Sequence, residues 1–299
     1  MSDRPGRSVR LACTQMSCTW DRAANIAKGE RLIRAAAGEG AQIVLLQELF
    51  ETPYFCIEQS DKHLALATTL EENESIRRFS ALAKELQLVL PVSWFERAGR
   101  STFNSVAIID ADGSVLGTYR KSHIPNGIGY QEKQYFTPGD TGFRVWRTRY
   151  ATIGVGICWD QWFPECARAM ALMGAEILFY PSAIGTDPDM GMDALGPWQR
   201  VMQGHAVANS VPVVACNRVG TERATTTNLE LTFFGGSFIA DQTGAKLKEA
   251  DRSAEAVLVQ SFDLDACRRH REIWSLFRDR RPDLYGVLLT HDGSTRAGR

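Results

Sequence analysis

A carboxylate, an ammonium and a thiol stand at the ends of three strand-like segments of this sequence. The run IVLLQE ends at Glu48, GTYRK ends at Lys121, and GVGIC ends at Cys158. In an α/β fold, side chains at strand ends point into the crevice where ligands bind. A free thiol has a pKa near ~8.5, so a nucleophilic cysteine needs a base or a cation beside it. The three strand ends together predict a site for covalent catalysis by Cys158.

Each of these residues also has a plainer interpretation. A cysteine is most often a small buried hydrophobe, and a charge at a strand end is most often solvated. Other catalytic signatures are absent, because the sequence has no Walker A loop and no G-x-S-x-G elbow, and GVGICW carries Trp159 where a dinucleotide fingerprint needs glycine. The five histidines lie far apart, so we expect no metal site and no cofactor, although a dyad of cysteine with a distant histidine stays open.

The elements that must position these residues alternate between strands and helices, which is typical of an α/β protein. We expect one domain over residues 1–299, because no linker or low-complexity segment interrupts the pattern. Pro164 opens a helix shortly after Cys158, at the position where proline is favoured. Strands are expected at 8–16, 42–47, 88–95, 104–110, 114–120, 150–157, 175–181, 211–216 and 255–262, a hairpin at 234–247, and helices at 24–38, 73–87, 164–173 and 197–209.

Composition limits the class of protein. The chain has 299 residues, of which 44% are hydrophobic and 23% charged, as in ordinary globular proteins. Its 34 basic and 35 acidic residues nearly cancel, which makes nucleic acid an unfavoured partner. No apolar run approaches the ~18–20 residues of a membrane span, and the polar N-terminus lacks the apolar region of a secretory signal. The seven scattered cysteines indicate reduced thiols, so a cytoplasmic location is expected.

The motifs around the three strand ends resemble those of the nitrilase superfamily of carbon–nitrogen hydrolases. The resemblance is carried by QELF (47–50), YRKSHIP (119–125) and GICWD (156–160), and it extends over nearly the whole chain. It implies a four-layer α-β-β-α sandwich with a Glu-Lys-Cys triad. Longer segments are similar to the subgroup that acts on N-carbamoylputrescine, a small-molecule substrate. These segments are QELFETPYFC, KSHIPNGIGYQEK, ICWDQWFPE, EILFYPSAIG and RDRRPDLY.

The resemblance implies a role for each catalytic residue. Cys158 would be the nucleophile, and Glu48 the general base that takes its proton and later activates water. Lys121 would stabilise the tetrahedral oxyanion together with the backbone N–H of Trp159. Glu132 matches a second glutamate of many members and would support the substrate or Lys121. As a surface loop carboxylate, it would instead be solvated.

The substrate end of the pocket is less constrained by the sequence. The ammonium of N-carbamoylputrescine requires a carboxylate or aromatic faces, and Asp187 matches the acidic residue that the family places after the I-G motif. Tyr54, Tyr130 and Trp159 are the candidate wall residues, although aromatic side chains are also common in cores. His123 is expected to support the site by a hydrogen bond rather than to react.

Other functions stay open at this stage. A carbamoyl-amino-acid hydrolase, for example on N-carbamoyl-β-alanine, would need a cation in the pocket, and a nitrilase shares the triad but fits the longer segments less well. A non-catalytic scaffold member would be expected to lack triad residues, whereas all three are present. The resemblance also implies a homo-oligomer, with a C-terminal tail at about 264–299 contributing to assembly.

Overall fold

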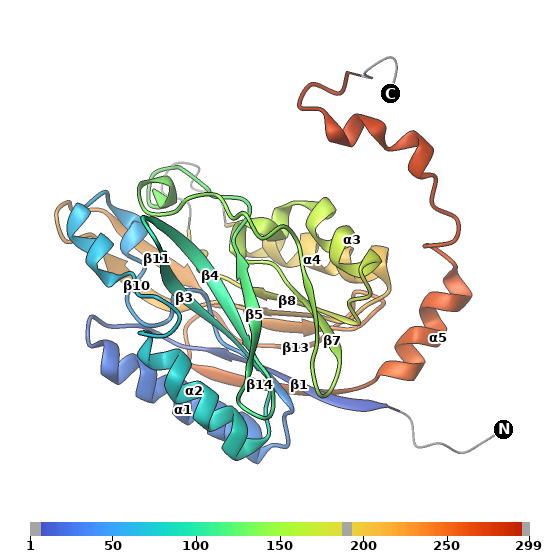
Figure 1. The fold of residues 1–299 in the computed structure, drawn as a ribbon, viewed down its shortest axis with the longest axis horizontal. Coiled ribbons are helices and arrows are strands. Elements are labelled where there is room, and N and C mark those ends of the chain that lie inside the picture. Colours follow the sequence, from blue (N-terminus) through green and yellow to red (C-terminus); the bar gives the residue numbers. More distant parts are fainter. Residues whose placement is uncertain (1–6, 187–192, 295–299) are drawn as a thin grey trace.

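Two β-sheets face each other at the centre of the fold in a computed structural model that describes residues 7–186 and 193–294 (Figure 1). The first sheet has the strand order β14-β1-β2, and an isolated bridge between Ile43 and Val89 connects it to the meander β3-β4-β5. These strands are β14 (Ala256–Asp263), β1 (Ser8–Gln15), β2 (Ile43–Leu45), β3 (Leu90–Ala98), β4 (Ser101–Ile109) and β5 (Val115–Arg120). Strands β1 and β2 are parallel, whereas β14 runs antiparallel to β1.

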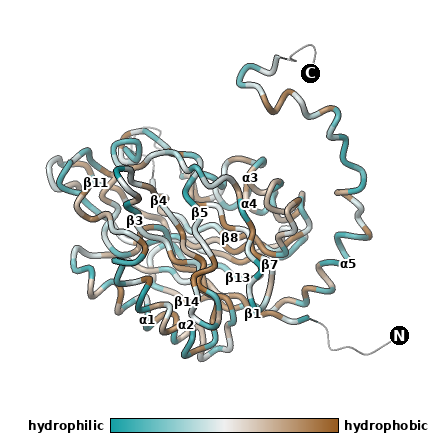
Figure 2. Tube along the Cα trace, viewed as in Figure 1, coloured by the Kyte–Doolittle hydropathy of each residue, from teal (hydrophilic) through white to brown (hydrophobic). Residues whose placement is uncertain are grey.

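The second sheet has the order β13-β12-β9-β8-β7-β6, with β7, β8 and β9 parallel. Its strands are β6 (Val145–Arg147), β7 (Thr152–Val155), β8 (Ile177–Pro181), β9 (Val213–Cys216), β12 (Phe238–Ala240) and β13 (Lys246–Glu249). Every residue of β8 and β9 is buried, as expected for parallel strands that are covered on both faces. Figure 2 shows hydrophobic residues concentrated along the strands of the two sheets.

Helices cover the outer face of each sheet. Helices α1 (Arg22–Gly38) and α2 (Glu74–Leu86) lie on the first sheet, while α3 (Pro164–Leu172) and α4 (Leu195–Asn209) lie on the second (Figure 1). The side chains of Asp21 and Asn73 cap α1 and α2 by accepting hydrogen bonds from their first turns. One apolar core fills the space between the sheets and beneath α3 and α4, and another lies beneath α1 and α2. These four layers confirm the expected α-β-β-α sandwich.

The hairpin expected at 234–247 begins later in the structure. Residues 219–234 form a separate pair, β10 (Val219–Arg223) and β11 (Glu230–Phe234), which sequence reasoning missed. Gly235 and Gly236 then both adopt positive φ, at 57° and 67°, and turn the chain into β12. The expected turn is present, since Gly244 N–H donates to Asp241 O.

The C-terminal segment extends from the sandwich (Figure 1). Helix α5 (Leu264–Trp274) buries Leu264 and Cys267, and the chain continues through two short 3-10 turns, Pro282–Leu284 and Gly286–Leu289. Large apolar side chains are exposed along this segment, with Leu289 87% exposed and Ile273 79%. Within the described part of the chain, no helix is both long and apolar enough to span a bilayer.

Candidate active site

The Cys158 thiol lies at a sharp turn directly after β7. Cys158 begins a short 3-10 helix, Cys158–Trp162, and has φ of +42°, in the left-handed region that disfavours side chains. Asp160 holds this turn, because its Oδ2 accepts a hydrogen bond of 2.9 Å from Ile157 N. A Cβ atom at Gly156 would lie 3.0 Å from Cys166 Sγ and from Tyr180 Cε1, which is tighter than ordinary contact, so glycine fits this approach to the turn best. The sequence therefore builds a strand-to-helix elbow that presents the sulfur.

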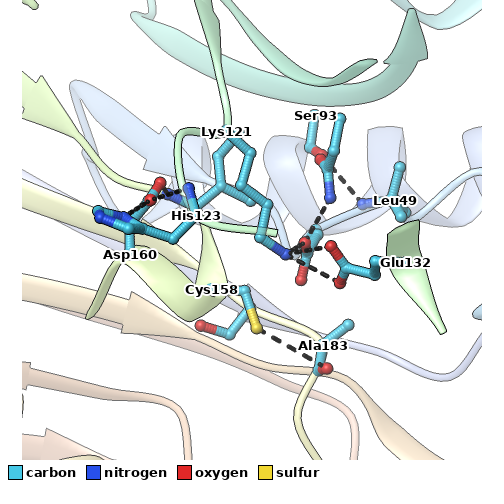
Figure 3. Close-up of polar contacts among 12 residues, drawn as sticks. Leu49, Ser93, Lys121, His123, Glu132, Cys158, Asp160 and Ala183 are labelled. Atoms are coloured by element: carbon cyan, nitrogen blue, oxygen red, sulfur yellow. Dashed lines mark hydrogen bonds and ion pairs between the residues drawn. The ribbon is translucent and has the colours of Figure 1, made fainter. Parts of the chain in front are cut away.

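Lys121 connects two carboxylates beside this elbow (Figure 3). Its Nζ lies 2.8 Å from Glu48 Oε1 and 2.8 and 2.7 Å from the two oxygens of Glu132. All three side chains are fully buried. The ammonium comes from the end of β5 and Glu48 from the turn that follows β2, whereas Glu132 opens a short 3-10 helix in the loop after Lys121. The structure thus brings together all four residues expected at the catalytic centre.

Glu48 keeps one carboxylate oxygen free of hydrogen bonds from the described residues. Its Oε1 accepts from Lys121 and, at 2.6 Å, from Asn104 Nδ2. Its Oε2 is buried and has no hydrogen-bond partner among the described residues. Cys158 Sγ lies 3.9 Å from the carbonyl oxygen of Ala183 (Figure 3). A buried carboxylate oxygen without a donor is a good proton acceptor, as a general base must be.

Burial and charge set the protonation of this cluster. Burial raises the pKa of the Cys158 thiol well above its ordinary value, and the charge of Glu48 raises it further. Burial lowers the pKa of Lys121, but Glu132 and Glu48 outweigh this effect and raise the pKa well above its ordinary value. Burial raises the pKa of Glu132 to about 7, against the opposing effect of Lys121. The resting site therefore holds an ammonium and a neutral thiol, so Cys158 requires a base.

A cavity of about 420 Å³ opens onto Cys158 and Glu132. Trp159 and Tyr130 line it, as expected, and Tyr130 accepts a hydrogen bond from Gly185 N at 2.8 Å. The described lining residues are Pro125, Asn126, Gly127, Ile128, Tyr130, Glu132, Cys158, Trp159, Trp162, Ile184, Gly185, Ala194 and Pro197. Glu132 is the one charged side chain among them. The size and lining suit a small molecule with an apolar chain, and Glu132 provides a negative charge at one end of it.

Tyr54 and Asp187, which were expected to bind the substrate, are not among the described residues that line the cavity. Tyr54 is fully buried and is not among the residues that line the cavity. Its hydroxyl instead donates to Glu132 Oε1 at 2.6 Å, so the ring supports the carboxylate rather than forming a wall. Asp187 lies outside the described residues.

Asp160 is a site residue that sequence reasoning did not single out. Its carboxylate is fully buried and accepts hydrogen bonds from Tyr119, His123 and Ile157. His123 makes the supporting hydrogen bond expected of it, since its Nδ1 lies 2.7 Å from Asp160 Oδ1, and its ring stacks on Phe163 with a centroid distance of 3.6 Å. The signal in the sequence was the acidic residue two positions after the cysteine. Among the described residues, no three histidine, cysteine or acidic side chains are grouped as a metal site.

Comparison with known proteins identifies the family. The sequence pattern of the carbon–nitrogen hydrolase family matches residues 10–272. The chain belongs to this family. N-carbamoylputrescine amidase from Oryza sativa subsp. japonica is 59% identical over 291 residues, covering 96% of this chain and 97% of the relative. Citrullinase from Francisella tularensis subsp. tularensis is 52% identical over 283 residues, covering 94% of this carbon–nitrogen hydrolase and 98% of the relative.

Solved structures give the same family and fold. A carbon–nitrogen hydrolase from Helicobacter pylori G27 superposes with a TM-score of 0.90 at 39% identity, covering 95% of this chain and 99% of that one. Saccharomyces cerevisiae Nit3, a member of the nitrilase superfamily, has a TM-score of 0.77 at 26% identity, covering 94% and 100%. The sandwich of this carbon–nitrogen hydrolase is therefore of the nitrilase type, as the sequence predicted.

Proposed function

We propose that this carbon–nitrogen hydrolase converts N-carbamoylputrescine to putrescine, carbon dioxide and ammonia, with Cys158 as the nucleophile. The observation that carries the proposal is the buried cluster of Glu48, Lys121 and Glu132 beside an elbow cysteine, at a cavity with no described cation in its lining. Identity of 59% to an N-carbamoylputrescine amidase over nearly the full chain supports the substrate.

Acylation begins with proton transfer from Cys158 Sγ to Glu48. The thiolate attacks the carbamoyl carbon, which is a poor electrophile because both nitrogens donate into it. The carbonyl oxygen becomes an oxyanion that Lys121 and the backbone N–H of Trp159 stabilise. Glu48 returns the proton to the leaving nitrogen, the carbon–nitrogen bond breaks, and ammonia leaves. The carbonyl carbon, still bonded to the putrescine nitrogen, then remains on the sulfur of Cys158 as an N-(4-aminobutyl)carbamoyl group.

Hydrolysis of this intermediate uses the same base. Glu48 takes a proton from water, and the resulting hydroxide attacks the carbamoyl carbon. The carbon–sulfur bond breaks, the thiol regains its proton from Glu48, and the released carbamate decays to carbon dioxide and putrescine. The mass of the trapped adduct tests the order of departure, because an adduct retaining the diamine requires that ammonia leave first.

The charge of the cavity lining favours N-carbamoylputrescine over an amino-acid substrate such as citrulline. Citrulline carries the same ureido group, but it also carries an α-carboxylate that needs a basic partner when buried. No lysine or arginine is among the described lining residues, whereas the Trp159, Trp162 and Tyr130 rings suit an ammonium. The 52% identity to a citrullinase makes citrulline the competing substrate to test.

The deciding experiment measures ammonia and putrescine release from N-carbamoylputrescine, with citrulline and N-carbamoyl-β-alanine in parallel. We expect kcat/KM for N-carbamoylputrescine to exceed kcat/KM for the other two substrates by about 100-fold or more. The reason is that the carboxylate of each competing substrate would find no basic partner among the described lining residues. Equal or faster turnover of either carboxylate substrate would contradict the assignment. Turnover of none of them would reject the proposed activity.

We also propose that residues 1–299 form one domain whose C-terminal tail, at about 264–299, contacts a second copy of this chain. The exposed apolar side chains of the tail support this assembly. They include Ile273, Trp274, Leu284, Val287, Leu288 and Leu289. An oligomer would remove this surface from water.

A further inference from the structure

Arg218 is a fully buried arginine directly after β9, far in sequence from the proposed base. Its Nη2 donates to the carbonyl oxygens of Glu48 and Leu49, at 2.8 and 3.0 Å. Its Nη1 donates to Thr52 O at 3.3 Å and to Glu222 Oε1 at 2.8 Å. One guanidinium therefore binds three carbonyls of the turn that carries Glu48, and Glu222 balances its charge.

This turn has a backbone conformation that needs such support. Leu49 has φ of +49°, in the left-handed region that costs a non-glycine residue roughly 1–2 kcal/mol. Its N–H donates to Ser93 Oγ at 3.0 Å, and its carbonyl accepts from Arg218. Strained backbone persists where its surroundings hold it. If the turn relaxed, the peptide bond after Glu48 would rotate. The Glu48 side chain would then lose its hydrogen bonds from Asn104 and Lys121.

Arg218 also contacts residues that support the second carboxylate, that of Glu132. Its guanidinium carbon is 5.8 Å from the centroid of the Tyr54 ring. Glu222 Oε2 accepts from Tyr54 N, and the Tyr54 hydroxyl donates to Glu132. The ion pair of Arg218 and Glu222 thus contacts the supports of both acidic residues that bind Lys121.

We propose that Arg218 is a positioning residue that aims the Glu48 carboxylate at Cys158 by holding the carbonyls of Glu48 and Leu49. This rests on the proposed function, in which Glu48 is the base. Arginine suits the task because its planar fork offers five donors in fixed directions, which a lysine ammonium cannot reproduce. Arg218 does not line the cavity, so its effect reaches the reaction through Glu48.

The first test compares Arg218→Lys with the wild type. We expect kcat to fall about tenfold or more while KM changes by less than about threefold, because an interaction that matters in the transition state is lost. The rate at which iodoacetamide alkylates Cys158, followed by peptide mass spectrometry, should fall in parallel. An unchanged kcat, or a rise in KM alone, would overturn the proposal.

A double-mutant cycle with Glu48→Gln tests whether Arg218 acts through the base. If it does, Arg218→Lys slows alkylation in the wild-type background and has little further effect in Glu48→Gln, because the two effects are not additive. Full additivity would overturn the proposal. Leu82→Ala, in the separate core beneath α2, is the control that lowers Tm without touching the site. An equal loss of alkylation rate in this control at equal loss of Tm would show a merely structural role.

A second variant covers the case in which Arg218→Lys does not fold. Arg218→Met with Glu222→Gln removes both members of the pair, so that neither is left buried and unpaired. The same loss of alkylation rate is expected, and its absence would overturn the proposal. Alkylation does not depend on the natural substrate. If the wild type fails to hydrolyse N-carbamoylputrescine, that failure rejects the substrate, while the alkylation cycle still decides the role of Arg218.

Discussion

Asp160 Oδ1 accepts two hydrogen bonds from His123, one from the backbone N–H at 3.0 Å and one from Nδ1 at 2.7 Å. Its other oxygen accepts from the Tyr119 hydroxyl at 2.8 Å. Tyr119 and His123 flank Lys121 in sequence, and Asp160 follows Cys158 by two residues. One buried carboxylate therefore fixes the distance between the proposed nucleophile and the proposed oxyanion donor.

Substitution Asp160→Asn should damage catalysis more than binding. The amide offers one acceptor oxygen, so its NH₂ group would face donors that now bind a carboxylate, at a cost of about 1–3 kcal/mol. We expect kcat to fall by about 10–100-fold through misplacement of Lys121 and Cys158, with a lower Tm. His123→Gln is the matched control, because it keeps the backbone bond and should cost less. Steady-state kinetics showing an unchanged kcat in Asp160→Asn would refute this role.

Removal of the nucleophile separates chemistry from backbone strain. Cys158→Ala and Cys158→Gly should both lose turnover by about 10⁴-fold or more, since neither can form the covalent intermediate. The glycine variant should be the more stable of the two, because Cys158 has φ of +42°, where alanine is strained and glycine is not. Thermal unfolding of both variants checks the strain, and residual hydrolysis near the wild-type rate would contradict the nucleophile assignment.

The stability of the fold should respond to the pKa of Glu132. Burial raises this pKa to about 7 in the folded protein from an ordinary value of 4.5. Between these values the folded state binds a proton that the unfolded state has released, so the contribution of Glu132 to stability falls as pH rises from about 4.5 to 7. Tm measured against pH for the wild type and Glu132→Gln tests this. As pH rises, the Tm of Glu132→Gln should increase relative to the Tm of the wild type. A Tm difference that stays constant with pH would contradict this prediction.

The C-terminal tail provides a test of assembly. Leu288→Glu with Leu289→Glu places charges on two of its exposed apolar residues, and we expect the oligomer to dissociate into smaller species. Leu116→Glu is a control at an exposed leucine on β5 of the sandwich. Light scattering coupled to size-exclusion chromatography gives the masses. A species of unchanged mass in the tail variant would contradict the proposed contact.

The sequence predicted most of the sandwich because its strands and helices carry clear apolar periodicity and turn signals. The run of buried residues at 177–181 and the capped helices α1 and α2 are local features of this kind. The pair β10 and β11 escaped because each strand has only five residues and β10, with the pattern buried-exposed-exposed-buried-exposed, lacks a regular alternation. Pairing of β14 with β1 joins residues about 250 positions apart, which periodicity cannot reveal.

By itself, the sequence indicated three strand ends with reactive groups, because Glu48, Lys121 and Cys158 each close a strand-like segment. Tertiary structure alone decided which partners these side chains have. It buried Glu132 against Lys121, directed Tyr54 to Glu132 rather than to the cavity, and brought Arg218 to the carbonyl of Glu48 across 170 positions. Such contacts depend on how the sheets pack face to face, since hydrogen bonds between distant residues leave no periodic trace in the chain.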